Sequence, residues 1–391
     1  MEKKIIYGKI LIGDNMRGIY IHIPFCRKIC NYCDFYKMVV SDKFKEKFTE
    51  YLIKDLLLTK EKYQINKINT IYIGGGTPSA MPLILLEKLF LSLAREFELN
   101  KIDEFTIEVN PEDINYELIS LFKKYGVTRI SIGVQTFNMN CYNILGRVTD
   151  YNMLKEKIKI LNTLGFDNYS FDLIYAVPNT SIEDLTKDLD KILSLNPKHI
   201  STYSLILEER TILSKKIELD KIELITEELD LKMYDHIVDY LKRYDFTRYE
   251  TSNFSRAGYE SKHNLIYWNC DEYYGVGPAA SSFVNNLRFT KVNDIKKYYD
   301  FIDKKTEPVV EYEYLDKRRF MEDYIMLGLR KTKGINVPVF NEKFNTNLFK
   351  EFNKIEELIN ENSILYENDF IKINEKYTYI SNHIIGKILF G

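Results

Sequence analysis

Three cysteines within a span of eight residues have the clearest capacity for chemistry in this sequence. Cys26, Cys30 and Cys33 are separated by three and two residues, and they follow a short apolar run that is typical of a β-strand. Thiolates are the preferred ligands of iron–sulfur clusters and of zinc, and three of them in one loop can hold one face of a [4Fe–4S] cluster. A cluster held by only three cysteines keeps one iron open, which implies a further ligand from outside the protein.

A structural zinc site is the alternative use of these thiols. Such sites normally have four protein ligands, often arranged as two Cys-x-x-Cys pairs, and the sequence has no second pair. The two remaining cysteines, Cys141 and Cys270, are solitary, and an isolated cysteine is more often a small buried side chain than a ligand. The pattern therefore favours an iron–sulfur cluster.

The composition indicates a globular protein with one large domain and a smaller one. The chain has 391 residues, of which 45% are hydrophobic, and its formal net charge is −2. Because nucleic-acid binding calls for a basic surplus, we expect no nucleic-acid partner. No run approaches the length of a membrane span, and residues 1–13 lack the features of a secretory signal. Clustered cysteines fit a reducing compartment, so we expect the protein in the cytoplasm.

Six β-like runs alternate with amphipathic helical stretches in the first half of the chain. This alternation predicts a parallel α/β fold, and chemistry in such folds lies at the carboxyl ends of the strands. Six units are too few for an eight-stranded barrel, so the pattern alone leaves an open sheet and a partial barrel equally favoured. The predicted strands are 18–25, 69–73, 105–109, 129–134, 169–174 and 199–206, and the helices are 43–59, 82–95, 116–125, 151–164 and 182–193.

The pattern changes after residue 207. A long charged helix is predicted at 222–244, followed by an aromatic and glycine-rich segment at 249–283 that contains His-Asn-Leu-Ile-Tyr-Trp from His263. The last segment has helical stretches and then two short β-like runs, which indicates a mainly helical α+β module of the winged-helix kind. We predict three domains, with boundaries at 1–210, 211–310 and 311–391.

The three cysteines resemble the Cys-x3-Cys-x2-Cys signature of the radical S-adenosylmethionine (SAM) superfamily. In that superfamily the open iron of a [4Fe–4S] cluster binds the amino and carboxylate groups of SAM, and the fold is a partial (β/α)6 barrel. The resemblance therefore decides between the two predicted folds and implies both cofactors. It also carries SAM-binding roles over to residues near the strand ends: Tyr20, Gly75, Gly76, Thr77, Glu108, Gln135, Arg147 and Asp172.

Two of these assignments have specific implied roles, each with a structural alternative. The glycines at 74–76 are similar to the segment that binds the methionine amino group of SAM, but such a run is also a simple tight turn. Glu108 resembles the family glutamate that accepts ribose hydroxyls. A carboxylate in an apolar strand is costly unless it is paired, so an ion pair or a solvent-facing position is the alternative.

Several segments together are similar to the family of oxygen-independent coproporphyrinogen III oxidases, which includes HemN and its relative HemW. The segments are His-Ile-Pro-Phe-Cys, Gly-Gly-Gly-Thr-Pro-Ser, Ile-Glu-Val-Asn-Pro, Ser-Ile-Gly-Val-Gln-Thr-Phe and Asp-Leu-Ile-Tyr, and the resemblance covers residues 18–285 and, more weakly, the C-terminal module. There are three departures from the family pattern. Ala176 and Asn179 stand where glycines are usual, and Thr149 replaces a histidine.

Two features separate the branches of this family. The decarboxylating oxidases have a fourth cysteine where this chain has Phe35, and they have a longer arm than the 25 residues that precede Cys26. The His-Asn-x-x-Tyr-Trp motif instead matches the HemW branch, regarded as haem chaperones. The resemblance thus implies haem binding, with His263 as a ligand of the haem iron, and transfer of haem to an acceptor protein of respiratory electron transport.

Two alternatives stay open beside this interpretation. The histidine motif is also explained by a structural His–Asn corner beside an aromatic cluster. The whole protein is also explained as a coproporphyrinogen oxidase, in which the reduced cluster donates an electron to SAM and a 5′-deoxyadenosyl radical abstracts hydrogen from a propionate side chain.

Overall fold

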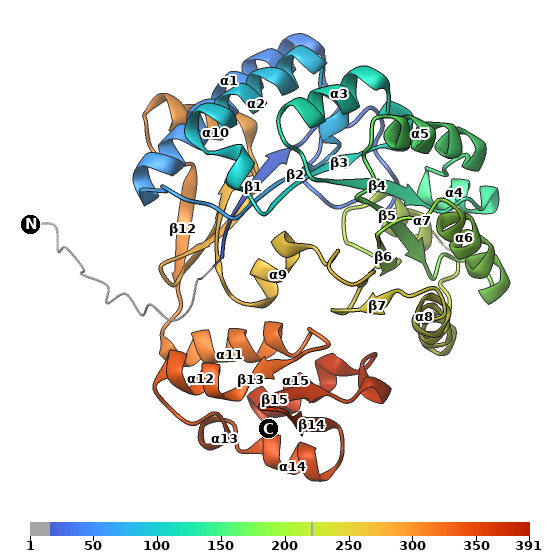
Figure 1. The fold of residues 1–391 in the computed structure, drawn as a ribbon, viewed down its shortest axis with the longest axis vertical. Helices are drawn as coiled ribbons and strands as arrows, with labels where there is room; N and C mark the ends of the chain where they lie inside the picture. Colours follow the sequence, from blue (N-terminus) through green and yellow to red (C-terminus); the bar gives the residue numbers. More distant parts are fainter. Residues whose placement is uncertain (1–15, 220–221) are drawn as a thin grey trace, which may run out of the picture.

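One long, strongly curved β-sheet forms the centre of the molecule in the computed structural model, which describes residues 16–219 and 222–391 (Figure 1). Residues 1–15, which include the stretch considered for a secretory signal, lie outside the described residues. Within the described residues the sheet has twelve strands, in the order β12 (Val309–Tyr314), β11 (Leu287–Lys291), β10 (Ser281–Val284), β9 (Glu272–Val276), β1 (Arg17–Ile23), β2 (Thr70–Gly75), β3 (Glu104–Val109), β4 (Arg129–Gln135), β5 (Tyr169–Tyr175), β6 (His199–Ser204), β8 (Asn253–Ser255) and β7 (Thr247–Arg248).

Strands β1 to β6 are parallel neighbours in sequence order, and helices cover their outer, convex face (Figure 1). This is the partial (β/α)6 barrel, so the predicted fold class is confirmed. The predicted strands and helices are present, with ends that differ by a few residues. The covering helices are α1 (Asp42–Tyr63), α2 (Leu83–Glu96), α3 (Tyr116–Lys124), α5 (Tyr151–Thr163), α6 (Ile182–Ser194) and α8 (Glu227–Lys242).

The barrel core lies between the sheet and these helices. On β3, Phe105, Ile107 and Val109 are buried among other apolar side chains, and Glu108 points to the opposite, concave face. Helix α6 shows how the sequence fixes such a helix. Ser181 caps it with a capping box that involves Asp184, and one apolar face is buried.

The sheet continues beyond the predicted boundary at residue 210. Strand β9 pairs in parallel with β1, and β10, β11 and β12 extend the sheet in antiparallel fashion. At the other edge, β8 pairs with β6. The first two predicted domains therefore share one sheet. The remaining short helices of the described barrel and extension are α4 (Tyr142–Leu145), α7 (Ile212–Glu218), α9 (Lys262–Trp268) and α10 (Ile295–Asp303), with 3₁₀ turns η1 (Pro78–Ala80), η2 (Leu99–Lys101), η3 (Pro111–Asp113) and η4 (Met139–Cys141).

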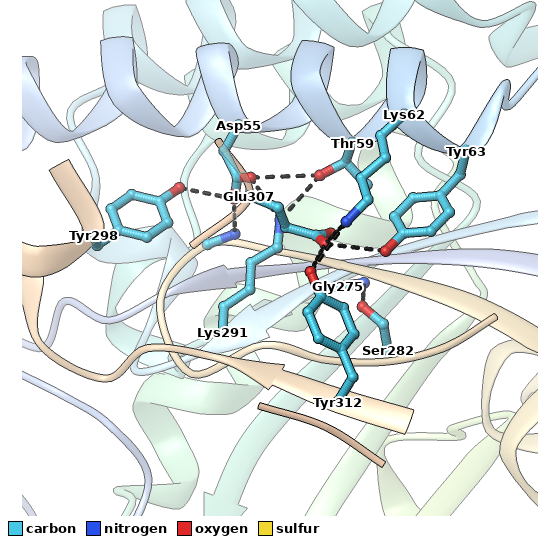
Figure 2. A network of polar contacts seen from close by, with 11 residues as sticks. Asp55, Thr59, Lys62, Tyr63, Gly275, Ser282, Lys291, Tyr298, Glu307 and Tyr312 are labelled. Carbon is cyan, nitrogen blue, oxygen red and sulfur yellow. Dashed lines mark hydrogen bonds and ion pairs between the residues drawn. The ribbon is translucent and has the colours of Figure 1, made fainter. Parts of the chain in front are cut away.

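A buried ion pair joins the extension to helix α1 (Figure 2). The Lys291 ammonium lies 2.5 Å from Asp55 Oδ1, and both side chains are completely inaccessible to solvent. Asp55 also accepts hydrogen bonds from the Tyr298 hydroxyl and the Gly277 backbone N–H, and Lys291 donates to the Thr59 hydroxyl. A buried charge needs such partners, since an unpaired one is very costly.

The C-terminal module has its own hydrophobic core and a three-stranded sheet in the order β13-β15-β14. Its elements follow the order helix, strand, three helices, two strands and a final helix, which is that of a winged helix with one additional helix before the two strands and one after them. The helical segment at residues 348–360 is divided into two short helices at Phe352, whose backbone (φ −130°, ψ 69°) is not helical. The elements are α11 (Lys317–Gly328), β13 (Ile335–Asn336), α12 (Val337–Phe344), α13 (Leu348–Glu351), α14 (Lys354–Asn360), β14 (Ile364–Glu367), β15 (Phe370–Ile373), η5 (Glu375–Tyr377) and α15 (Ser381–Phe390).

Among the described residues, no helix combines the length and the apolar character that crossing a membrane requires.

Candidate functional site

A cavity of about 450 Å³ opens at the carboxyl ends of the barrel strands and extends along their concave face. This is where a parallel α/β fold places its chemistry. Its wall contains all but two of the residues predicted from the sequence to bind a cofactor or metal: Cys26, Cys30, Cys33, Gly75, Gly76, Thr77, Glu108, Gln135, Arg147 and Asp172.

The three cysteines lie in a loop that backbone hydrogen bonds fix to neighbouring segments. Cys26 N donates to the Met38 carbonyl at 3.0 Å, and Asn31, between the second and third cysteines, donates its N–H to the Leu145 carbonyl at 2.9 Å. The three thiols are half-buried and are not joined in disulfides. The loop therefore presents its sulfur atoms to the cavity from a fixed backbone.

The donor set of this loop fits a cluster better than a single ion. Within the described chain, no three His, Cys, Asp or Glu side chains converge closely enough to hold one metal ion. In a cubane cluster each cysteine binds a different iron, so such convergence is not needed. Burial raises the pKa of the Cys26 and Cys33 thiols. Ligation by iron has to supply the stabilisation of the thiolates, and Lys37, which donates to the Cys33 carbonyl oxygen, adds a positive charge beside them.

The glycine run after β2 brings backbone close to the cavity. Gly75 has a φ of 117°, and a Cβ at this position would lie 2.6 Å from the His22 ring. Its N–H donates to Glu108 Oε2 at 3.0 Å, and the Thr77 hydroxyl lies 3.7 Å from Cys26 Sγ. Glycine is therefore required at 75 by backbone conformation and by space.

Glu108 lies half-buried on the cavity wall between two hydrogen-bond donors. Besides the Gly75 N–H, it accepts from the Tyr72 hydroxyl at 2.9 Å. Burial, with a smaller contribution from the nearby Asp172 carboxylate, raises the pKa of Glu108 to about 7. The arrangement matches neither a solvent-facing residue nor an ion pair, and it provides a carboxylate for a polar ligand in the cavity.

Three further polar side chains line the cavity near Glu108: Gln135 on β4, Asp172 on β5 and Arg147 in the segment after α4. Gln135 adopts a φ of 69° at an irregularity in the β4–β5 pairing, and such backbone strain concentrates at functional sites. Arg147 donates to the Gly133 carbonyl at 2.7 Å and lies 3.8 Å from Glu112. Asp172 accepts from the Ser131 hydroxyl, and burial raises its pKa.

Tyr20 does not line the cavity but lies beside Tyr72, which does. Its hydroxyl lies 3.0 Å from His22 Nδ1, and its ring packs beside that of Tyr72. His22 Nε2 in turn bonds to the Tyr36 carbonyl, so this buried histidine is satisfied. Tyr20 and His22 thus pack next to two residues of the wall, Tyr72 and Gly75.

His263 is fully enclosed at the opposite end of the barrel strands. It lies on helix α9, within the curve of the sheet (Figure 1), and it does not line the cavity. Its Nδ1 lies 2.7 Å from the hydroxyl of Thr70, at the start of β2, and its Nε2 lies 2.8 Å from the Tyr267 hydroxyl. Burial lowers the pKa of His263 to about 3. Because both ring nitrogens are engaged by hydroxyl groups of the protein, this geometry does not support His263 as a ligand of haem iron, and it favours a structural role for this residue.

Several residues of the cavity wall were not singled out in the sequence. Successive side chains of a strand point to opposite faces of the sheet. Glu108, Gln135 and Asp172 therefore define which positions on β3, β4 and β5 face the cavity. The same parity, applied along the strands, indicates further wall residues. Those found are Asn110, Arg129, Ser131, Ile174, His199, Ser201 and Tyr203, with Tyr72 on β2.

Known proteins match this chain over nearly its whole length. Residues 20–192 match the Radical SAM superfamily, and residues 315–377 match the HemN C-terminal domain. A protein of Lactococcus lactis subsp. lactis (strain IL1403) named Heme chaperone HemW is 36% identical over 371 residues, 95% of this chain and 96% of that protein. The chain belongs to the HemW family of radical SAM proteins. Its Bacillus subtilis (strain 168) relative of the same name is 31% identical over 376 residues, 96% of this chain and 99% of that one.

The solved structure of HemN, coproporphyrinogen III oxidase from Escherichia coli and described as a radical SAM enzyme, has the same fold. Its TM-score is 0.82 at 18% identity, and the match covers 96% of this chain and 90% of that chain. Membership of the radical SAM superfamily implies a [4Fe–4S] cluster and SAM, and the cavity wall has the thiols and polar groups for both.

The departures from the HemW family pattern keep the local backbone. Ala176 and Asn179, which replace glycines, have φ values of 59° and 62° and thus retain the left-handed conformation that glycine adopts easily. The hydroxyl of Thr149, which replaces a histidine, donates to the Val134 carbonyl at 2.8 Å.

Proposed function

We propose that this protein is a haem chaperone that binds haem, a [4Fe–4S] cluster and SAM, and delivers haem to an acceptor protein of the respiratory chain. The observation that carries the proposal is the similarity to proteins named Heme chaperone HemW, which extends over at least 95% of this chain in both relatives. It therefore includes the cysteine loop, the His-Asn-x-x-Tyr-Trp motif and the C-terminal module.

In this proposal the cavity holds the cluster and SAM. Cys26, Cys30 and Cys33 bind three irons, and when bound the cluster supplies an open iron for SAM and an electron when it is reduced. The protein binds and orients the ligand. The backbone at Gly75 and Gly76, together with Thr77, contacts the methionine end of SAM. Glu108 accepts hydrogen bonds from the ribose hydroxyls of SAM. Gln135, Arg147 and Asp172 contact the remaining polar groups, and Tyr20 packs beside Tyr72, which lines the cavity.

The proposal places the protein in the cytoplasm, with a membrane-associated respiratory enzyme as the acceptor. Five free cysteines, three of them half-buried at the cavity, fit a compartment in which thiols stay reduced. The net charge of −2 gives no support for a nucleic-acid partner.

A haem titration of the anaerobically reconstituted protein tests the proposal. We expect about one haem retained per chain after desalting, and loss of that haem when an acceptor membrane fraction is added. The control is the same titration with the protein after transfer, which should take up haem again. No retained haem, with iron and sulfide confirming an intact cluster, contradicts the proposal.

Oxidase activity is the alternative function, and it is tested separately. Phe35, which lies on the cavity wall, stands where the oxidase branch has its fourth cysteine. We therefore expect no conversion of coproporphyrinogen to protoporphyrinogen in an anaerobic assay with SAM and a reductant. Turnover by the cluster-loaded protein would establish the enzyme instead of the chaperone.

A further inference from the structure

Three large apolar side chains are exposed to solvent around the mouth of the cavity. Ile29, Phe35 and Ile206 are 37%, 64% and 67% exposed, and all three line the cavity. Single exposed apolar residues are common on protein surfaces, but a group that surrounds one opening marks a binding site. We call these three residues the apolar rim.

The apolar rim is held in place by the elements beneath it. Ile29 and Phe35 belong to the cysteine loop, in which the Asn31 side chain donates to the Ile144 carbonyl at 2.9 Å. Ile206 follows β6, in the segment that leads to α7, and within α7 the Leu213 N–H donates to the Asn31 carbonyl at 2.8 Å. The two sides of the mouth are thus connected to each other, so the rim is a prearranged surface.

A cation next to Ile29 of the apolar rim has no carboxylate partner among the residues that the structure describes. Lys28 precedes Ile29 and lines the cavity, and its ammonium donates to the Tyr142 hydroxyl at 3.0 Å and to the Gly146 carbonyl at 3.1 Å. In the portion of the chain that the structure describes, no Asp or Glu forms an ion pair with it. The neighbouring Arg27, in contrast, is paired with Asp113 at 2.8 Å. Lys28 is therefore available to an anionic ligand.

We propose that haem docks across the mouth of the cavity, with its apolar macrocycle against Ile29, Phe35 and Ile206 and a propionate at Lys28. Haem has both elements of the required chemistry, a flat apolar face and carboxylates at one edge. The inference rests on the proposed chaperone function and names the surface that this function uses. It also places haem at the carboxyl ends of the strands, next to the cluster loop and away from the enclosed His263.

The experiment compares haem affinity among variants of the full-length, cluster-loaded protein. Ile206→Ser and Phe35→Ser remove apolar contact area, and Lys28→Gln removes the cation and keeps a donor. Phe390→Ser is the matched control, since Phe390 is 86% exposed on α15, in the C-terminal module. Absorbance titration gives the dissociation constant for haem, and iron and sulfide analysis shows whether the cluster is intact.

We expect each Ser variant to weaken haem binding about tenfold. The free energy gained by burying a large apolar side chain corresponds to a tenfold change in the dissociation constant or more. Lys28→Gln should weaken haem binding and should affect a haem dimethyl ester, which lacks the carboxylates, much less. The control should bind as the wild type does. Ile206→Ser is decisive because it lies outside the cysteine loop, so a change there cannot be attributed to cluster loss.

The outcomes separate the two proposals. If the wild type retains no haem, the chaperone function fails and the docking surface fails with it. If the wild type binds haem and Ile206→Ser and Phe35→Ser bind it equally well, only the docking surface is wrong. A rim that instead contacts the acceptor protein would leave haem affinity unchanged and slow only the transfer, and this result also overturns the inference.

Discussion

Glu108 accepts two hydrogen bonds, yet its position on the cavity wall raises its pKa to about 7 from an ordinary value of 4.5. Between about pH 4.5 and pH 7 the folded chain therefore binds more protons at this residue than the unfolded chain does. Stability contributed by such a group is present below pH 4.5 and is lost as the pH rises through 7. Burial thus destabilises the charged form of this carboxyl.

The Glu108→Gln variant should therefore lose less stability with rising pH than the wild type does. We expect the difference to be about 2 kcal/mol between pH 5 and pH 8, since one pKa unit corresponds to about 1.4 kcal/mol. Urea unfolding of the cluster-free proteins at both pH values measures it. If the free energy of unfolding falls equally in the two proteins between pH 5 and pH 8, ionisation of Glu108 does not destabilise the folded protein.

At the scale of single residues, the sequence predicted which residues line the cavity better than it predicted the hydrogen bonds and the burial of each side chain. Glu108 and Gln135, polar residues near the ends of predicted strands, were assigned through the resemblance to radical SAM proteins, and both line the cavity. His199 was missed although it has the parity of the cavity face, because nothing in the sequence shows that the strand's first residue reaches the wall. His263 was assigned to haem through a motif, which gives residue types and spacing but not the burial that encloses the ring.

The His-Asn-x-x-Tyr-Trp motif fixes helix α9 to the sheet. The N–H groups of Lys262 and His263 donate to the Glu104 carboxylate at 3.0 Å, and His263 bonds to Thr70, so the helix joins the starts of β2 and β3. The motif therefore anchors a helix within the curve of the barrel.

Replacement of His263 by alanine should destabilise the protein and leave haem binding unchanged. The variant leaves the Thr70 and Tyr267 hydroxyls without the ring partner and creates a cavity, which together cost about 2 to 4 kcal/mol. Thermal unfolding and haem titration measure the two effects, and His383→Ala, at an exposed position on α15, is the control. Lost haem uptake in a variant that stays folded would restore His263 as a ligand.

The buried pair Asp55–Lys291 connects α1 to β11 in the extension (Figure 2). Lys291→Met should lower the free energy of unfolding by about 3 to 5 kcal/mol, because it leaves the Asp55 carboxylate buried without its cation. Lys88→Met, which breaks an exposed pair between α2 and α1, should cost less than about 1 kcal/mol. Denaturant unfolding of both variants measures the difference, and equal small losses would mean that the buried pair contributes little.

The elements of the barrel were predictable because their patterns are local, whereas the extension was not. Alternating apolar residues identify a strand such as β3, and a 3.6-residue period identifies α6. The pairing of β9 with β1 joins residues far apart in the sequence, since Tyr20 lies opposite Gly275. No local pattern in the sequence encodes such a pairing.

On the scale of the whole molecule, this pairing makes the extension a continuation of the barrel. Strand β1 has β2 on one side and β9 on the other, and α9 fills the curve of the sheet from within. The predicted domain of residues 1–210 contains β1 but neither β9 nor α9. Alone, it would expose the β1 edge and leave Asp55 buried without Lys291.

A fragment of residues 1–210 should therefore fail to fold, although it contains all six parallel strands. A fragment of residues 1–314, which keeps all twelve strands of the described sheet, is the matched control and should give a cooperative thermal transition. Circular dichroism and limited proteolysis compare the two: we expect rapid digestion of the shorter fragment and protected strands in the longer one. A shorter fragment that unfolds cooperatively would mean that β1 is stable with a free edge, and the boundary at residue 210 would then separate two independent domains.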